Sequence, residues 1–159
     1  MYAALVVDDE EIIRRGICRK LERFFPQLKL APPQENALEA LHYIQNNQVD
    51  IVYVDIRMPL VDGLEFISRA RQYNPYLQFV VISGYTNFEY ARTALQLEVK
   101  DYLLKPIDNG EFRKVTARLI KELDEKKEQI RDRRHVKSQA EEGKFLKKSR
   151  YLTELVRAD

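Results

Sequence analysis

The chain has 159 residues, a formal net charge of +2 and an apolar content of 45%, values that suit one globular domain with an appendage. Its single cysteine, Cys18, excludes an internal disulfide and favours a reducing compartment. Because no apolar stretch reaches the length of a membrane span and the N-terminus lacks a signal-peptide pattern, we expect a cytoplasmic protein without a membrane partner.

Short apolar runs alternate with helical patterns over residues 1–110, which predicts a parallel sheet flanked by helices. The first strand is expected over residues 2–7, and Pro26 closes the helix that follows it. That helix carries apolar residues at helical spacing: Ile13, Ile17, Leu21 and Phe24. A short second strand over residues 28–31 precedes a helix that ends near Asn46. The apolar residues of this second helix include Leu38, Leu41 and Ile44.

The next strand–helix unit follows the same pattern. Residues 51–54 form the third expected strand. The third helix begins near Gly63 and ends before Pro75, because proline disfavours helix in the residue that precedes it. Residues 79–82 and 101–104 form the last two strands.

The fourth helix is expected between these last two strands, from about Asn87 to Leu97. One face of it consists of Phe88, Ala91 and Leu95. Five strands and five helices in strict alternation predict an α/β fold with a doubly wound, flavodoxin-like (βα)5 parallel sheet. The strand order expected for such a sheet is 2-1-3-4-5, followed here by a long C-terminal helical extension.

The C-terminal helix is expected to start after Asp108, a residue type that caps helix N-termini well. Its apolar stripe consists of Phe112, Val115, Leu119, Leu123 and Ile130. Lys126 and Arg133 occupy positions where a strong coiled coil would have apolar groups. The helix can therefore dimerise as a weak coiled coil or lie solvated as a linker, and we expect a homodimer.

The basic excess of the chain lies in this tail, since residues 111–159 carry more basic than acidic residues and residues 1–110 carry the opposite balance. Charges of both signs are interleaved, which is typical of a solvated helix face rather than a nucleic-acid-binding surface. Gly143 is expected to break or bend the helix. A short amphipathic segment follows, with Phe145, Leu152 and Val156 on one face.

Acidic side chains follow two of the apolar runs. Asp8 and Asp9 end the first run, and Asp55 ends the third. Because strands 1 and 3 are neighbours at the point where the winding reverses, these carboxylates are expected to meet at the carboxyl edge of the sheet. Lys105 follows the fifth strand and Ser83 ends the fourth, so the same edge gains one ammonium and one hydroxyl.

Three neighbouring carboxylates repel one another and need a cation to remain ionised together. Mg²⁺ suits such a set, because it takes one or two carboxylates and completes its shell with water and substrate oxygens. A zinc site is not indicated, since His42 and His135 lack zinc-ligand spacing. A carboxylate beside Mg²⁺ can act as a nucleophile toward phosphorus, while Lys105 neutralises charge on the phosphoryl oxygens.

The motifs VVDDE, VDIRMPLVDGLEF, VISGY and DYLLKP, in this order, resemble the receiver domain of two-component response regulators over residues 2–120. The phrases SGYTNFEYARTAL and KDYLLKPID resemble most the subfamily whose output module is an AraC-type helix-turn-helix DNA-binding domain. This resemblance implies a receiver domain at residues 1–122. Residues 123–159 would then be a charged helical linker, truncated before the output domain through which DNA would be bound.

The resemblance also implies a role for each pocket residue. Asp55 would be the phosphoacceptor. Asp9 and Asp55 would bind Mg²⁺ together with the backbone carbonyl of Arg57, and Asp8 would assist through water. Lys105 would pair with the phosphoryl group.

The remaining implied roles concern switching. The bond between Lys105 and Pro106 would be cis. Ser83 would hydrogen-bond the phosphoryl group, and Tyr102 would change rotamer with it. These movements would shift an existing inactive–active equilibrium in the fourth helix and last strand, and so control an output, which we expect to be transcription. The phosphoryl donor would be a sensor histidine kinase.

Simpler interpretations exist for single residues. Asp8 or Asp9 could merely cap the first helix, and Ser83 could be a turn residue. Tyr102 could be only a half-buried strand aromatic. Glu98 stands where receivers usually have a glycine, between the fourth helix and the last strand, so we expect altered turn geometry or modest strain there.

Two other functions compete with the signalling switch, which we expect to be a non-enzyme. A Mg²⁺-dependent phosphatase with an aspartate nucleophile usually carries a second acid two residues later, where this chain has Arg57. A phosphorylation-independent interaction module with a relic pocket is the other alternative. Turnover of small phosphate esters would favour the first, and failure to take up phosphate would favour the second.

Overall fold

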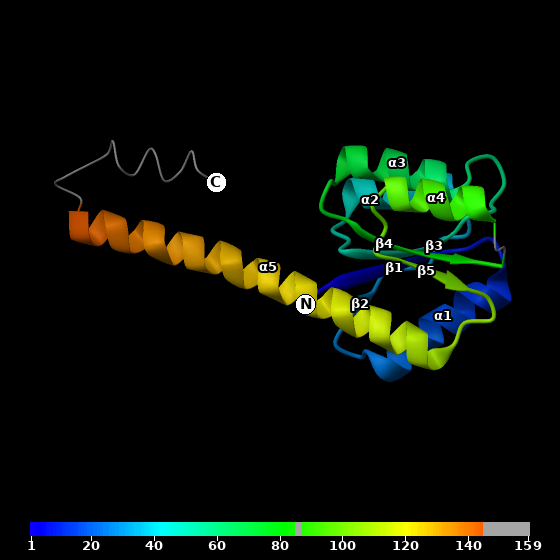
Figure 1. Ribbon diagram of the computed structural model, residues 1–159, viewed down its shortest axis with the longest axis horizontal. Coiled ribbons are helices and arrows are strands. Elements are labelled where there is room, and N and C mark those ends of the chain that lie inside the picture. Colours follow the sequence, from blue (N-terminus) through cyan, green and yellow to red (C-terminus); the bar gives the residue numbers. More distant parts are fainter. Residues whose placement is uncertain (85–86, 145–159) are drawn as a thin grey trace. The chain divides into compact units, whose positions relative to one another are not determined.

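The computed structural model describes residues 1–84 and 87–144, with side chains described up to residue 134. The chain divides into two compact units, Met1–Leu119 and Ile120–Asp159. Five parallel strands of the first unit pair in the order β2-β1-β3-β4-β5, which confirms the expected flavodoxin-like sheet (Figure 1). In chain order the elements are β1 (Ala3–Val7), α1 (Glu11–Phe24), β2 (Lys29–Leu30), α2 (Ala37–Asn46), β3 (Ile51–Asp55), α3 (Gly63–Tyr73), β4 (Gln78–Ser83), α4 (Phe88–Gln96), β5 (Asp101–Leu104) and α5 (Asn109–Lys144).

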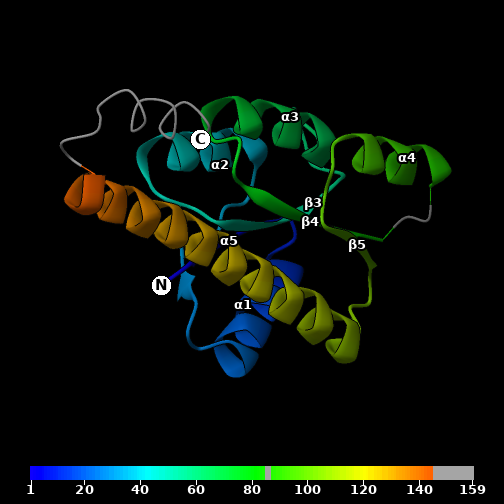
Figure 2. The same ribbon diagram turned by 60° about the vertical axis from the view of Figure 1, so that its left-hand side comes forward.

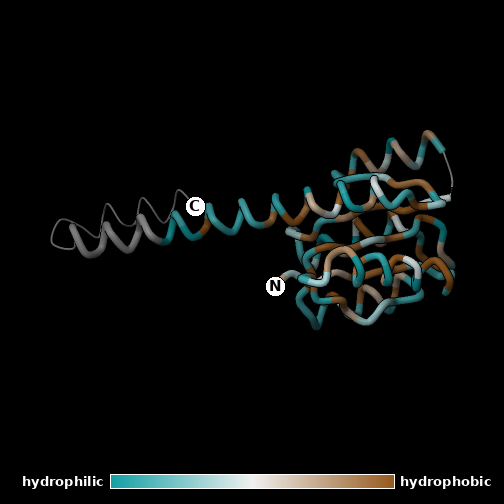
Figure 3. Tube along the Cα trace, turned by 90° about the horizontal axis from the view of Figure 1, so that it is seen from below, coloured by the Kyte–Doolittle hydropathy of each residue, from teal (hydrophilic) through white to brown (hydrophobic). Residues whose placement is uncertain are grey.

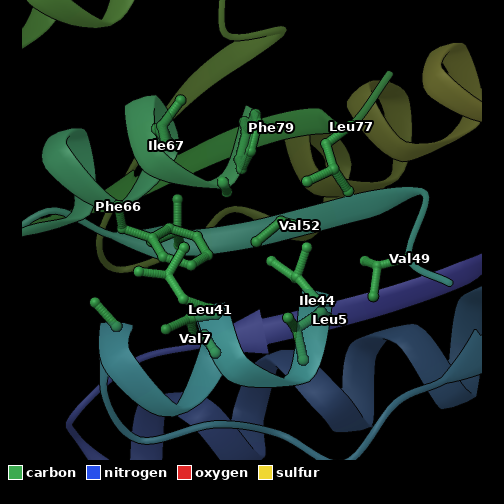
Figure 4. Close-up of a cluster of buried hydrophobic side chains, with 14 of the residues drawn as sticks. Leu5, Val7, Leu41, Ile44, Val49, Val52, Phe66, Ile67, Leu77 and Phe79 are labelled. Atoms are coloured by element: carbon green, nitrogen blue, oxygen red, sulfur yellow. The ribbon is translucent and has the colours of Figure 1, made fainter. Parts of the chain in front are cut away.

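The central strands are covered on both faces, as the unbroken apolar runs indicate. Every residue of β1 and β3 is buried. Helices α2, α3 and α4 lie on one side of the sheet, and α1 and the first turns of α5 lie on the other (Figures 1 and 2). The core between the sheet and α2 and α3 is a single apolar cluster, in which the rings of Phe66 and Phe79 meet edge to face at 6.2 Å (Figure 4).

The first turns of α5 are anchored to β3 on the opposite side of the sheet. The ring of Phe112 is fully buried and stacks on Tyr53 with a centroid distance of 5.3 Å. The Tyr53 hydroxyl and the Thr116 Oγ1 are hydrogen-bonded at 2.6 Å, and both residues are buried. This bond satisfies two polar groups that would otherwise be costly to bury.

Side-chain caps start several helices where the sequence predicts them. Asp108 accepts a hydrogen bond from the Glu111 amide at 2.9 Å, as expected for the start of α5. Asp62 accepts from the Glu65 amide at 2.8 Å and starts α3. Gly63 then packs so closely on β3 that a Cβ there would lie 2.1 Å from the Asp55 carbonyl oxygen, which leaves room only for glycine.

The apolar face of α4 that the sequence identifies points largely to solvent. Phe88 and Leu95 are 76% and 77% exposed, and the buried residue of this helix is Ala94. Helical spacing identifies a face but not the direction in which it points. Here Ala94 is buried and Tyr90 packs against the core, while Phe88 and Leu95 face solvent.

Two irregular features occur at the edges of the fold. Strand β2 has only two residues, shorter than the expected residues 28–31, and Pro32 and Pro33, which cannot donate backbone hydrogen bonds, follow soon after it. Glu98, between α4 and β5, has a φ of 56° and so adopts the left-handed backbone that a glycine would favour. The turn thus keeps the geometry of a glycine turn, so the expected altered geometry is wrong and the expected strain at Glu98 is confirmed.

The described part of the second unit continues α5 from Ile120 to Lys144. It is largely hydrophilic along its length, and Ile130 of the expected stripe is exposed (Figure 3). The described part of α5 includes Gly143 and ends at Lys144, so the expected break or bend there stays a prediction. The amphipathic segment expected around Phe145, Leu152 and Val156 lies outside the described residues. Among the described helices, none is both long and apolar enough to cross a membrane.

Candidate functional site

The candidate site lies where four neighbouring strands end. Parallel pairing places Val7 beside Val54, Asp55 beside Ile82, and Ser83 beside Leu104. Asp8 directly follows β1, Asp55 and Ser83 end β3 and β4, and Lys105 directly follows β5. The strand order thus brings together side chains that are far apart in the sequence.

Four carboxylates converge at this edge. One oxygen from each of Asp8, Asp9, Glu10 and Asp55 lies within 4.8 Å of the others. Asp8 and Asp55 are buried, whereas Asp9 and Glu10 are exposed. The Glu10 amide donates to Asp8 Oδ1 at 2.9 Å, which fixes the orientation of the most buried carboxylate.

Lys105 points its ammonium group into this cluster. Its Nζ lies 3.1 Å from Asp8 Oδ2, 3.5 Å from Asp55 Oδ1 and 3.6 Å from Glu10 Oε1. The backbone amide of Lys105 donates to the Ser83 carbonyl oxygen at 2.9 Å, so pairing of β5 with β4 positions the side chain. The peptide bond between Lys105 and Pro106 is cis, as expected.

Burial and mutual repulsion perturb the carboxyl groups. Burial, and after it the Asp8 carboxylate, raise the pKa of Asp55 to about 6, although the Lys105 ammonium opposes both effects. Burial also raises the pKa of Asp8, against the hydrogen bond from the Glu10 amide and the charge of Lys105. Although burial lowers the pKa of Lys105, the carboxylates of Asp55 and Asp8 outweigh it and raise that pKa.

The donor set fits a hard divalent cation. Three of these carboxylates share the Lys105 ammonium, and burial and crowding raise the pKa of Asp55 although that ammonium favours its ionised form. Oxygen-only donors that are partly buried and partly open to solvent are the type of site that Mg²⁺ occupies with some of its waters retained. Asp8, Asp9 and Asp55 are the expected ligands in this set, and Glu10 is an addition.

Glu10 was not predicted as a site residue, because only the acidic pair before it ends the first apolar run. Glu10 is the N-cap of α1, yet its side chain makes no capping hydrogen bond. Glutamate is a poor N-cap residue, and that mismatch was the signal available in the sequence. The alternative that Asp8 or Asp9 is the N-cap of α1 is wrong, since Glu10 occupies this position.

Three other expected site residues have defined surroundings. Ser83 is fully buried at the end of β4. Tyr102 is partly buried and packs against the main apolar cluster. The side chain of Arg57, whose backbone carbonyl is an expected Mg²⁺ ligand, contacts α4, because its Nε donates to the Tyr90 hydroxyl at 3.4 Å.

Most of the chain matches a known protein family. The family model of the response regulator receiver domain matches residues 4–117. The transcriptional regulatory protein YesN of Bacillus subtilis is 33% identical over 156 residues, which cover 98% of this chain and 42% of YesN. The transcriptional regulatory protein HptR of Staphylococcus aureus is 31% identical over 129 residues, covering 81% of this chain and 50% of HptR. The chain thus spans half or less of these relatives.

Solved structures resemble the first unit closely. The receiver domain of AraT, a response regulator from Geobacillus stearothermophilus, is 36% identical with a TM-score of 0.73, covering 79% of this chain and 98% of that one. A CheY-like receiver domain protein from Methanospirillum hungatei, at 24% identity and a TM-score of 0.70, covers 79% of this chain and 98% of its own and shows the shared fold.

Proposed function

Because the chain belongs to the response regulator receiver family, we propose that it accepts a phosphoryl group on Asp55 from a sensor histidine kinase and thereby switches an output. The observation that carries this proposal is the buried Asp55 carboxylate, which lies 3.5 Å from the Lys105 ammonium and within a cluster of further carboxylates. The family's members are signalling regulators, and we propose that this chain likewise turns over no external substrate.

The proposed reaction is a transfer between two side chains. A carboxylate oxygen of Asp55 forms a bond to phosphorus as the P–N bond of the donor phosphohistidine breaks. The electron pair of that bond stays on the imidazole nitrogen, which takes up a proton. The product is an acyl phosphate on Asp55 and a neutral histidine on the donor.

The residues around Asp55 would reduce the electrostatic repulsion between its carboxylate and the anionic phosphoryl group. Asp8, Asp9, Asp55 and the backbone carbonyl of Arg57 would hold Mg²⁺, which supplies positive charge at the phosphoryl oxygens. The ammonium of Lys105 supplies a second positive charge, and its contacts to Asp8 and Asp55 already aim it at the acceptor. The Ser83 hydroxyl, at the end of the adjacent strand, would donate to a phosphoryl oxygen.

We place the switch at the α4–β5 side of the domain. Ser83 ends β4 and pairs with Leu104 of β5. Movement of Ser83 and Lys105 toward the phosphoryl group would therefore shift both strands. Tyr102 on β5 would change rotamer in response. The same side carries exposed apolar residues of α4, Phe88 and Leu95, which would be covered when the active state forms a homodimer.

The names of YesN and HptR indicate that the output is transcription. We propose that residues 1–122 are the receiver domain and residues 123–159 a charged helical linker toward an AraC-type DNA-binding domain. DNA would then be bound by that output domain and not by the receiver, and the protein would work in the cytoplasm.

The proposal is tested by incubating the chain with acetyl phosphate and Mg²⁺ and measuring its intact mass. The expected result is the addition of one phosphoryl group, which Asp55→Asn abolishes and omission of Mg²⁺ suppresses. Asp62→Asn is the matched control, because asparagine also caps helices well and should leave both α3 and the addition intact.

Two outcomes contradict the proposal. No mass change, or an addition that survives Asp55→Asn, removes the proposed acceptor. Sustained hydrolysis of small phosphate esters would instead indicate a phosphatase, although the position two residues after Asp55 holds a cation, Arg57, where such enzymes need an acid.

A further inference from the structure

Glu10 occupies a helix N-cap position, but its side chain does not cap the helix. It is the N-cap of α1, with extended backbone, but it accepts no hydrogen bond from the amides of the first turn. Asp, Asn, Ser or Thr would cap this helix better, and a glutamate there sacrifices part of the helix stability. Its carboxylate instead lies 3.6 Å from the ammonium of Lys105. A residue that breaks a local rule beside a reactive pocket is a candidate for a functional role.

The three carboxylates around Lys105 differ in how freely they can release it. The side chains of Asp8 and Asp55 are 0% and 6% exposed, whereas that of Glu10 is 63% exposed. Leaving a buried carboxylate without its cation is costly, but an exposed carboxylate is solvated by water when its partner leaves. Glu10 is therefore the partner that Lys105 can exchange most easily for a new anion.

We propose that Glu10 is a positioning residue that holds the Lys105 ammonium at the mouth of the pocket and competes for it with the incoming phosphoryl group. This inference rests on the proposed phosphorylation of Asp55. An anionic donor must displace the Glu10 carboxylate from Lys105. It must also overcome the repulsion between its own charge and that of Glu10, so Glu10 lowers the rate of phosphorylation. The contact is long, at 3.6 Å, and its carboxylate is exposed although the Lys105 side chain is largely buried. We therefore expect Glu10 to slow phosphorylation by a factor of about three to ten.

Three substitutions separate this role from a general charge effect. Glu10→Gln removes the charge at the pocket. Glu11→Gln removes the same charge one residue further on, where the carboxylate is paired with Arg15 at 2.8 Å. Glu10→Asp keeps the charge but shortens the side chain by one methylene, which withdraws it from Lys105 and makes it a good cap for α1.

The experiment measures phosphorylation by acetyl phosphate at saturating Mg²⁺, with intact mass as the readout and the donor concentration varied. We expect the second-order rate constant to rise about three- to tenfold in Glu10→Gln, mainly through a lower half-saturating donor concentration. The rise should be smaller but still above about twofold in Glu10→Asp, because its charge remains near the pocket, and the change should stay below about twofold in Glu11→Gln. In a Lys105→Ala background, Glu10→Gln should give no such rise.

The outcomes distinguish the inference from the function on which it rests. If the wild-type chain takes up no phosphate, the proposed function fails and the inference fails with it. If the wild type is phosphorylated but Glu10→Gln matches either the wild type or Glu11→Gln, the inference alone is overturned. Slower phosphorylation of Glu10→Gln with a raised Mg²⁺ requirement would make Glu10 a metal ligand and also overturns it, as does wild-type behaviour of Glu10→Asp.

Discussion

Asp55 is a carboxyl group whose surroundings oppose its ionisation. Burial and the carboxylates of Asp8 and Asp9 raise its pKa to about 6, against the attraction of Lys105. A raised pKa in the folded state means that the ionised group destabilises the fold. This penalty is fully present above the folded-state pKa, and it disappears as the pH falls toward the ordinary value of 3.8.

We therefore expect Asp55→Asn to stabilise the domain at pH 7 in the absence of divalent cations, by about 1–3 kcal/mol. The difference in unfolding free energy between the variant and the wild type should shrink as the pH is lowered from about 6 toward 4. Urea unfolding followed by circular dichroism at several pH values, with EDTA present, measures this difference.

Added Mg²⁺ provides the control for this prediction. A cation bound by the ionised carboxylates should stabilise the wild type at pH 7 and reduce the advantage of Asp55→Asn. A difference that is independent of pH, or that grows as the pH falls, would contradict the account of the pocket.

Most of the pocket residues were predictable from the sequence, but Glu10 was not. Asp8, Asp9, Asp55 and Lys105 follow strands, and parallel strands end at one edge, so their convergence follows from topology. Glu10 lies in the loop after β1, and the direction of its side chain depends on Lys105, which is nearly a hundred positions away in the chain. Only the three-dimensional structure brings those two groups within contact.

At the scale of elements, the turn between α4 and β5 holds a residue in a strained conformation. Glu98 has a φ of 56°, and its carbonyl oxygen accepts a hydrogen bond from the Arg71 guanidinium of α3 at 2.9 Å. The bond uses the backbone of Glu98, so it does not depend on the side chain. The turn is thus tied to α3 whatever residue stands there.

Replacing Glu98 with glycine should stabilise the domain by up to about 1 kcal/mol, because glycine adopts the left-handed region without steric cost. Glu98→Ala is the matched control, since alanine removes the same carboxylate but keeps the strain. Thermal unfolding of both variants measures the effect. Equal unfolding temperatures for the glycine and alanine variants would show that no strain is released.

Sequence patterns predicted where most helices and strands begin and end, but not how α4 is oriented. The strands and most helix ends were predictable from apolar runs, caps and proline positions, as at Asp62 and Asp108. The orientation of α4 was not, because Phe88, Ala91 and Leu95 form an equally good helical face whether it points inward or outward. The choice depends on how closely α4 packs on its neighbours, a tertiary effect that periodicity does not contain.

At the scale of the whole molecule, we expect concentration-dependent dimerisation that phosphorylation favours. Phe88 and Leu95 on α4 are exposed apolar groups beside the proposed switch, and burying them in an interface is favourable. Light scattering over a range of protein concentrations, with and without beryllofluoride as a phosphoryl mimic, should show dimers at lower concentration when the mimic is bound.

Two substitutions test whether α4 provides that interface. Leu95→Ser should weaken the dimer, whereas Leu38→Ser, at an exposed position on α2, should leave it unchanged. Monomers at every concentration, with and without the mimic, would exclude the predicted dimer.

The most direct measurement is the location of the phosphoryl group itself. After reaction with acetyl phosphate, borohydride reduces an aspartyl phosphate to homoserine, which peptide mass spectrometry can place in the sequence. We expect homoserine at position 55, with every other aspartate unchanged. Homoserine at Asp8 or Asp9, or an unreduced phosphate on a serine or histidine, would contradict it.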